Sequence, residues 1–159
     1  GYNIDDEAGG SMRTTALDYE LWFEFMRVWT DGLHRANVTV TADIGPQWAY
    51  DDPAMAAHFH ASPIDQFAVM STYFGDAGNF RLTLGYFLSI IPRHKLAVGL
   101  FPAGNPGSLS QTEAKLRAIQ AAGISEVWMF EWPKGYKTAP DWGYLFKQWK
   151  HGHVPPPPP

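Results

Sequence analysis

The feature that most constrains this chain is a regular alternation of strand-like and helix-like segments. Short strand-like stretches at 2–7, 38–44, 64–73, 95–101 and 124–132 each precede a stretch with helical character. Helices are predicted at about 16–36, 53–60, 80–91 and 110–122, and from 141 onward. Strands that alternate with helices typically form one parallel sheet, so the sequence predicts an α/β fold built from βα units.

The first predicted helix carries a long row of apolar residues. They recur at helical spacing, while Asp18, Glu20 and Glu24 take the other side. We expect this row to pack into the core rather than to form a cofactor site. Its members are Leu17, Leu21, Trp22, Phe25, Met26, Trp29 and Leu33.

Two arrangements accommodate these βα units. One is the C-terminal five-eighths of an eight-stranded TIM (β/α)8 barrel, which uses roughly 31 residues per unit. The other is a complete five-stranded, doubly wound, flavodoxin-like sheet in strand order 2-1-3-4-5. Length does not choose between them, but no glycine-rich phosphate loop follows a strand. We expect one α/β portion over residues 1–152, followed by a proline-rich tail over 153–159.

Functional residues of parallel sheets gather at the carboxyl ends of the strands, and the first strand is unusual there. Alternation directs Tyr2 and Ile4 to one face, whereas Asn3, Asp5 and Glu7 share the other. A carboxylate held beside another is a candidate general acid with a raised pKa. The simpler alternative is a solvated turn with acidic side chains.

The stretch Gly1–Glu7 resembles the fourth-strand signature of the chitinase and chitinase-like lectin family, glycoside hydrolase family eighteen. In that signature, aspartates alternate with hydrophobic residues and a glutamate ends the run. Glu7 stands at the family's acid and Asp5 at its partner aspartate. Asn3 replaces the middle aspartate, and Asp6 replaces the usual aromatic residue.

Later strands extend the resemblance in the family's order. Residues 64–73 resemble the sixth strand, with Met70 and Tyr73 near its end, and residues 95–101 resemble the seventh. Residues 123–132 resemble the eighth, whose final tryptophan corresponds to Trp132. The resemblance therefore implies the C-terminal part of a barrel, completed by an upstream segment or by a partner chain.

The family resemblance implies hydrolysis of β-linked amino sugars with substrate-assisted retention. Glu7 would protonate the glycosidic oxygen, while Asp5 and Tyr73 would hold the acetamido group that acts as nucleophile. Trp132 would stack under the sugar. Asn3, Asp43 and Trp48 are further candidates for substrate binding, and neither a metal nor a cofactor is expected.

Two other function classes remain open. The departures at Asn3 and Asp6 alter the charges around the acid, which favours a non-catalytic module that binds sugar or builds an extracellular assembly. A flavodoxin-like signalling or cofactor domain would instead bind Mg²⁺ or flavin beside Asp5 and Asp43.

Composition limits the partners and the compartment. The net charge of -4 gives no indication of a nucleic-acid partner, and no apolar run is long enough to span a membrane. Asn37 begins the glycosylation triplet Asn-Val-Thr, and the run Pro155–Pro159 is typical of polyproline II. Together they indicate an extracellular or cell-wall protein with a proline-rich shaft, and the aromatic content of 15% suits oligosaccharide or polysaccharide binding.

Overall fold

The structure is a computed structural model that describes residues 1–6, 16–45, 55–70, 77–100, 109–129 and 146–151. Its five strands are β1 Tyr2–Asp6, β2 Val40–Ile44, β3 Gln66–Val69, β4 Leu96–Leu100 and β5 Glu126–Met129. The helices are α1 Ala16–His34, α2 Met55–Ala61, α3 Ala77–Ile90 and α4 Leu109–Ala121, with a 3-10 turn η4 at Arg93–Lys95. Residues 146–150 form one further helical turn.

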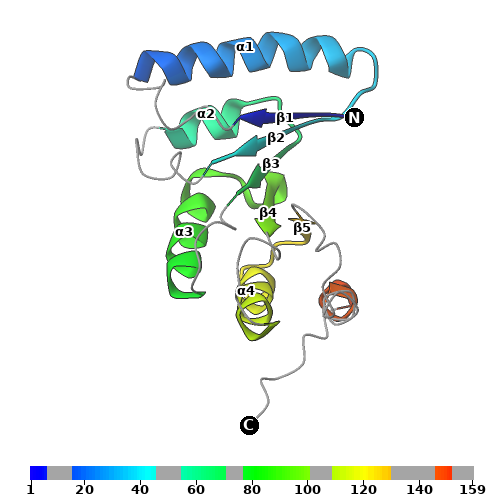
Figure 1. The fold of residues 1–159 in the computed structure, drawn as a ribbon. Coiled ribbons are helices and arrows are strands. Elements are labelled where there is room, and N and C mark those ends of the chain that lie inside the picture. Colours follow the sequence, from blue (N-terminus) through cyan, green and yellow to red (C-terminus); the bar gives the residue numbers. More distant parts are fainter. Residues whose placement is uncertain (7–15, 46–54, 71–76, 101–108, 130–145, 152–159) are drawn as a thin grey trace.

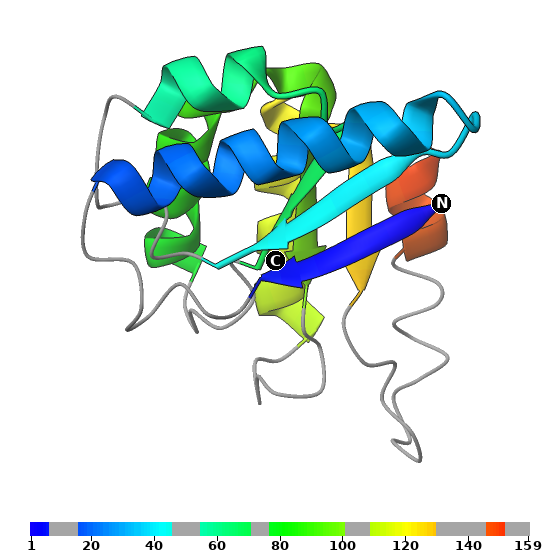
Figure 2. The ribbon, with the colours of Figure 1, turned by 90° about the horizontal axis from the view of Figure 1, so that it is seen from above.

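All five strands are parallel and lie in one sheet in the order β1-β2-β3-β4-β5. The predicted α/β fold with a parallel sheet of five strands is therefore confirmed. The order is sequential, so it differs from the 2-1-3-4-5 order expected of the flavodoxin-like alternative. Helices α1 to α4 follow one another in an arc around one side of the sheet (Figure 1), and Figure 2 shows the strands beneath α1. Right-handed crossovers between consecutive strands produce this one-sided arrangement.

The strands present an apolar face to the helices. In β2 the side chains of Val40, Ala42 and Ile44 are buried, whereas Thr41 and Asp43 are half-buried on the opposite face. This alternation does not extend to the next two strands, because residues 67–69 of β3 and all five residues of β4 are buried. The helix side of the sheet holds the hydrophobic core. Its strand members include Phe67, Val69, Leu96, Val98 and Leu100, which pack with Phe59, Phe80 and Phe87 from the helices.

The buried residues of helix α1 differ in part from the apolar row that the sequence predicted to be core. Met26 is fully buried, as expected, but the buried face also includes Tyr19 and Phe23, which were absent from the predicted row. Leu21 and Phe25, which were predicted to be core residues, are exposed by 60% and 62%. Trp22, Trp29 and Leu33 are half-buried against the core, and the side chain of Leu17 lies outside the described part. The apolar arc of α1 is wider than the face that the sheet can cover.

Two helices end in the left-handed conformation at their C-caps. Asn37 has φ 58° after α1, and Gly123 has φ 69° after α4. The following N–H groups bond back to the last turn, from Val38 to Leu33 at 3.1 Å and from Ile124 to Ile119 at 3.2 Å. This is the Schellman pattern, which satisfies carbonyls that would otherwise lack a partner.

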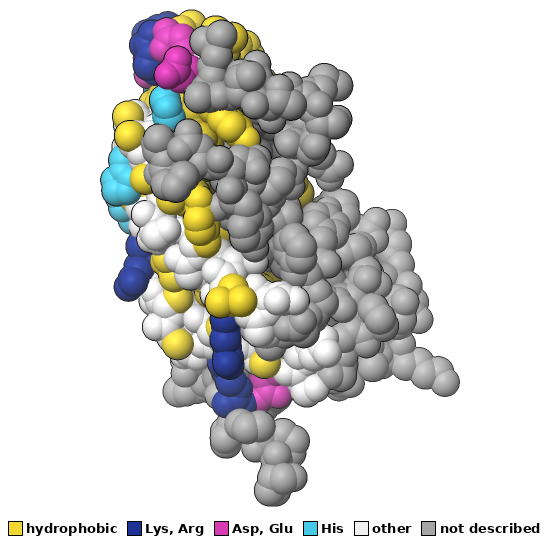
Figure 3. Space-filling view, turned by 90° about the vertical axis from the view of Figure 1, so that its left-hand side faces the viewer, with side chains coloured by type: hydrophobic (Ala, Val, Ile, Leu, Met, Phe, Trp, Pro, Cys, Tyr) yellow, Lys and Arg dark blue, Asp and Glu magenta, His cyan; other side chains and the backbone are white. Residues whose placement is uncertain are grey.

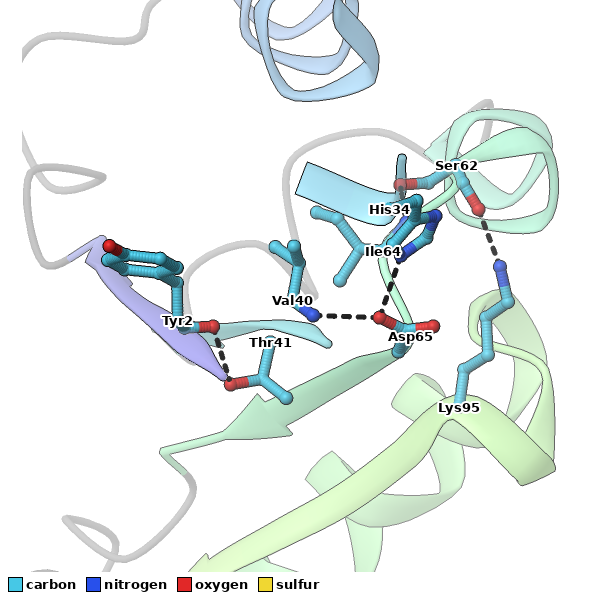
Figure 4. A network of polar contacts seen from close by, with 8 residues as sticks. All are labelled: Tyr2, His34, Val40, Thr41, Ser62, Ile64, Asp65 and Lys95. Atoms are coloured by element: carbon cyan, nitrogen blue, oxygen red, sulfur yellow. Dashed lines mark hydrogen bonds and ion pairs between the residues drawn. The ribbon is translucent and has the colours of Figure 1, made fainter. Parts of the chain in front are cut away.

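A polar network ties the amino edge of the sheet together (Figure 4). The Asp65 carboxylate accepts a hydrogen bond from the Val40 backbone N–H at 2.7 Å, and the same oxygen lies 2.9 Å from His34 Nε2. Lys95 donates to the Ser62 carbonyl at 2.5 Å. These bonds join the ends of α1 and α2 to the starts of β2, β3 and β4. Within the described ranges, no helix has the length and apolarity needed to cross a membrane.

Candidate functional site

The candidate site lies on the face of the sheet opposite the helices, toward the carboxyl ends of the strands. Parallel pairing of β1 with β2 aligns Asn3 with Thr41 and Asp5 with Asp43. Because alternate residues share a face, these four side chains form a two-by-two polar array. The sequence predicted that Asn3 and Asp5 share a face, and the register adds Asp43 to them.

Asn3 holds the array together. Its Nδ2 donates to Asp43 Oδ2 at 2.9 Å, and its Oδ1 accepts from Thr41 Oγ1 at 2.7 Å. The amide of one strand thus bridges two side chains of the next. Asp43 is positioned by this bond, whereas the neighbouring carboxylate of Asp5 is exposed to solvent. Strands of one sheet are about 4.8 Å apart, so the two acids lie side by side, and the Asn3 donor offsets part of their repulsion.

A small cavity of about 80 Å³ adjoins the two acids. Its lining crosses the sheet from β1 to β5 and comprises Asp5, Asp43, Ala68, Met70, Gly99, Trp128 and Met129. The wall is therefore acidic at one end, includes the small residues Ala68 and Gly99 in the middle, and is apolar at the Trp128 end. Carboxylates accept hydrogen bonds from hydroxyl or amide groups, and an indole presents a flat apolar surface.

Gly99 lies between the acidic end and the Trp128 end of the cavity lining, and glycine is required there for a steric reason. A Cβ at this position would lie 3.0 Å from the Val69 carbonyl oxygen and 3.7 Å from the Met70 Cα. Any larger residue would therefore press on the backbone of β3. The glycine keeps the two strands close and leaves the cavity open beside Trp128.

The cavity is smaller than the roughly 300–1,000 Å³ of a typical ligand site. It accommodates one polar substituent or one edge of a ring rather than a whole oligosaccharide. A ligand would have to extend from it over the carboxyl edge of the sheet, where the segments after the strands begin.

Four predicted site residues lie outside the described residues, namely Glu7, Trp48, Tyr73 and Trp132. Asn37, the predicted glycosylation site, is exposed in the turn between α1 and β2. That turn is at the amino edge of the sheet, so Asn37 is remote from the Asp5–Asp43 cavity. The described part brings together Asn3, Asp5 and Asp43 from the predicted set.

Trp128 and Met70 are cavity residues that the sequence analysis did not assign to the site. Met70 was noted only as part of the strand resemblance. Trp128 is four residues before Trp132, so simple alternation along a strand puts both on the same face. This spacing is the sequence feature from which Trp128 could have been predicted as a site residue.

Within the described ranges, no three His, Cys, Asp or Glu side chains are grouped so that they could hold a metal ion. Comparison of the chain with known protein families, curated proteins and solved structures found no match. The chemistry of the site therefore has to be argued from its geometry.

Proposed function

We propose that this chain is the C-terminal part of a barrel in a secreted carbohydrate-active protein, with its sugar site over the Asp5–Asp43 cavity. The observation that carries the proposal is the arrangement of Asp5, Asp43 and Trp128 in one cavity on the face away from the helices. Acids that accept sugar hydroxyls beside an aromatic surface are what carbohydrate recognition requires. The sequential strand order supports the barrel part of the proposal, because consecutive barrel strands are neighbours.

The proposed reaction is hydrolysis of β-linked amino sugars with the substrate's acetamido group as nucleophile. In this proposal Glu7 is the acid, Asp5 and Tyr73 hold the acetamido group, and Trp132 carries the sugar ring. The exposed Asp5 and the cavity beside it leave room for a substituent of the ring. Asn3, Asp43 and Trp48 then complete the sugar-binding set.

A non-catalytic sugar-binding or assembly module is the second candidate, and one observation favours it. The Asn3 amide is bound by both Thr41 and Asp43, so it acts as a bridge between β1 and β2. An amide cannot exchange a proton as the family's aspartate can. Asn3 therefore supports the position of Asp43 as a structural bridge between the two strands.

Binding is tested by calorimetric titration with an oligosaccharide of β-linked, N-acetylated amino sugars. We expect Asp43→Asn and Trp128→Ala each to weaken binding about tenfold or more, which corresponds to roughly 1.4 kcal/mol. Asp31→Asn is the matched control, because Asp31 lies on α1, outside the cavity lining, and its carboxylate pairs with Arg27 of the same helix. Unchanged binding in both cavity variants would overturn the proposed site.

Hydrolysis is tested separately with Glu7→Gln, using release of reducing ends as the measurement. Turnover by the parent protein that Glu7→Gln abolishes supports the enzyme. Sugar binding without turnover by the parent supports the non-catalytic module instead. The proposed extracellular location is tested by the mass shift that an endoglycosidase produces in protein from its native source, with the shift mapped to the peptide containing Asn37.

A further inference from the structure

Helix α1 carries a second apolar surface that the core does not use. Leu21, Phe25 and Val28 are exposed by 60%, 62% and 58%. Their spacing of four and three residues puts them in one line along the helix. We call these three residues the outer flank of α1. Clustered apolar side chains of this size on a surface usually mark an interaction site.

The position of the outer flank follows from two ring contacts. On one side of α1, Phe23 stacks on His58 of α2, with ring centroids 5.1 Å apart. On the other side, Trp29 meets Tyr2 of β1 edge-on at 6.0 Å. Phe25 is four residues before Trp29, so the outer flank continues on the β1 side, away from α2. Figure 3 shows hydrophobic and charged side chains side by side at the top of the molecule, where α1 lies.

The outer edge of strand β1, beneath this surface, has no neighbouring strand among the described residues. Among the described residues β1 pairs with β2 alone, so the backbone groups of its other edge are available for pairing. Tyr2 is 56% exposed on this strand. A free strand edge beside a free apolar helix surface is a template for one more strand and one more helix.

We propose that this surface is the docking site of one further βα unit of the same polypeptide, whose strand pairs in parallel with β1 and whose helix covers the outer flank. The proposed unit continues the series seen in the described part: α1 contacts α2 through Phe23, α2 packs on α3 and α3 on α4, while each strand pairs in parallel with the next. One more step of that series places a helix on Leu21, Phe25 and Val28. Connections from a helix to the next strand are short, about 2–6 residues, which favours the same polypeptide as the source. This inference rests on the barrel part of the proposed function.

The test is hydroxyl-radical footprinting of the full polypeptide expressed from its complete coding sequence, read by mass spectrometry. Leu82 on α3 is 74% exposed and has the same side chain as Leu21, so it is the internal control. We expect Leu21 to be oxidised several-fold more slowly than Leu82, with Phe25 and Val28 protected alongside it. We also expect cross-links from the Tyr2 region to a preceding segment of the same polypeptide.

Two results would overturn the inference. Oxidation of Leu21 at the rate of Leu82 would mean that nothing covers the outer flank. Protection that disappears on dilution would assign the surface to a second copy of the chain. The footprint should be identical in Asp43→Asn, because the cavity is on the other face of the sheet. If the parent protein bound no sugar while the outer flank stayed protected, the proposed function would be refuted and this inference would stand.

Discussion

The carboxylate of Asp65, just ahead of β3, accepts a hydrogen bond of 2.7 Å from the backbone N–H of Val40, the first residue of β2. His34 Nε2, at the end of α1, is 2.9 Å from the same oxygen. One side chain therefore fixes the register at which α1, β2 and β3 meet. In barrels built from parallel strands, residues at this amino edge contribute to stability, whereas active sites lie at the carboxyl edge.

We predict that Asp65→Ala lowers the free energy of unfolding by about 1–2 kcal/mol, after allowance for solvent screening of a half-exposed pair. Asp65→Asn should cost about half as much, because its oxygen still accepts from Val40. Urea unfolding measures both, with Asp31→Asn as the control. Equal midpoints for the Asp65 variants and the parent would contradict this account.

The stability of the protein should also depend on pH through Asp65. Burial acts to raise the pKa of Asp65, but the hydrogen bonds from Val40 and His34 and the charges of His34 and Lys95 outweigh it and lower the pKa. A carboxyl with a lowered pKa stabilises the fold above its unfolded value of about 3.9, and the contribution is lost as pH falls through the folded value. The difference between the parent and Asp65→Ala should therefore be largest at pH 5–6 and shrink toward about half of that value near pH 2, because the protonated carboxyl still accepts from Val40. A constant difference over this range would show that ionisation of Asp65 contributes nothing.

Asn3→Asp restores the aspartate of the resembled signature and tests the polar array. It replaces an amide that donates to Asp43 at 2.9 Å by a second carboxylate. We expect a loss of about 1–2 kcal/mol at pH 7 from the missing hydrogen bond and the like charge. The loss should be smaller near pH 4, where a shared proton can bridge the two acids, and one carboxyl should titrate above its usual range. NMR titration of the carboxyl groups in Asn3→Asp measures the raised pKa. The stability of Asn3→Ala, which loses the hydrogen bond but gains no charge, separates the two causes of the lost stability.

Asn37 gives a stability prediction that is independent of glycosylation. Its φ of 58° is in the left-handed region, which costs most residues about 1–2 kcal/mol but costs glycine nothing. In protein made without glycans, Asn37→Ala should lower the free energy of unfolding by about 1 kcal/mol, and Asn37→Gly should leave it equal or slightly higher. The thermal midpoints of the two variants compare them directly. A more stable Asn37→Ala would contradict the role of Asn37 as a C-cap.

Local patterns were sufficient to predict the fold class. Apolar residues at alternate positions located all five strands, and apolar residues at helical spacing located the main helices. Both patterns can be read from a single segment of the sequence. The ends were less accurate: β3 covers Gln66–Val69 instead of the predicted 64–73. Strand ends depend on which neighbour supplies hydrogen bonds, and that information is not local.

Helix α1 and the site required tertiary information. Its apolar residues cover more of the circumference than one face, so periodicity alone could not distinguish the buried Phe23 from the exposed Phe25. Likewise, the Asn3–Asp43 bond depends on the pairing of two strands separated by a long helix. The sequence placed Asn3 and Asp5 on one face and named Asp43 as a candidate, but only the register shows that Asp43 is the direct partner of Asp5.

The sequential strand order also affects how the protein can form and change. Each strand bonds only to the strands before and after it in the chain, so no pairing has to wait for a distant segment. A nascent chain leaving the ribosome can therefore build its sheet one strand at a time, in the order of synthesis. For the same reason, a whole βα unit can be added or lost at an edge while the existing hydrogen-bonded pairs stay intact, which is a route by which such sheets could grow by duplication.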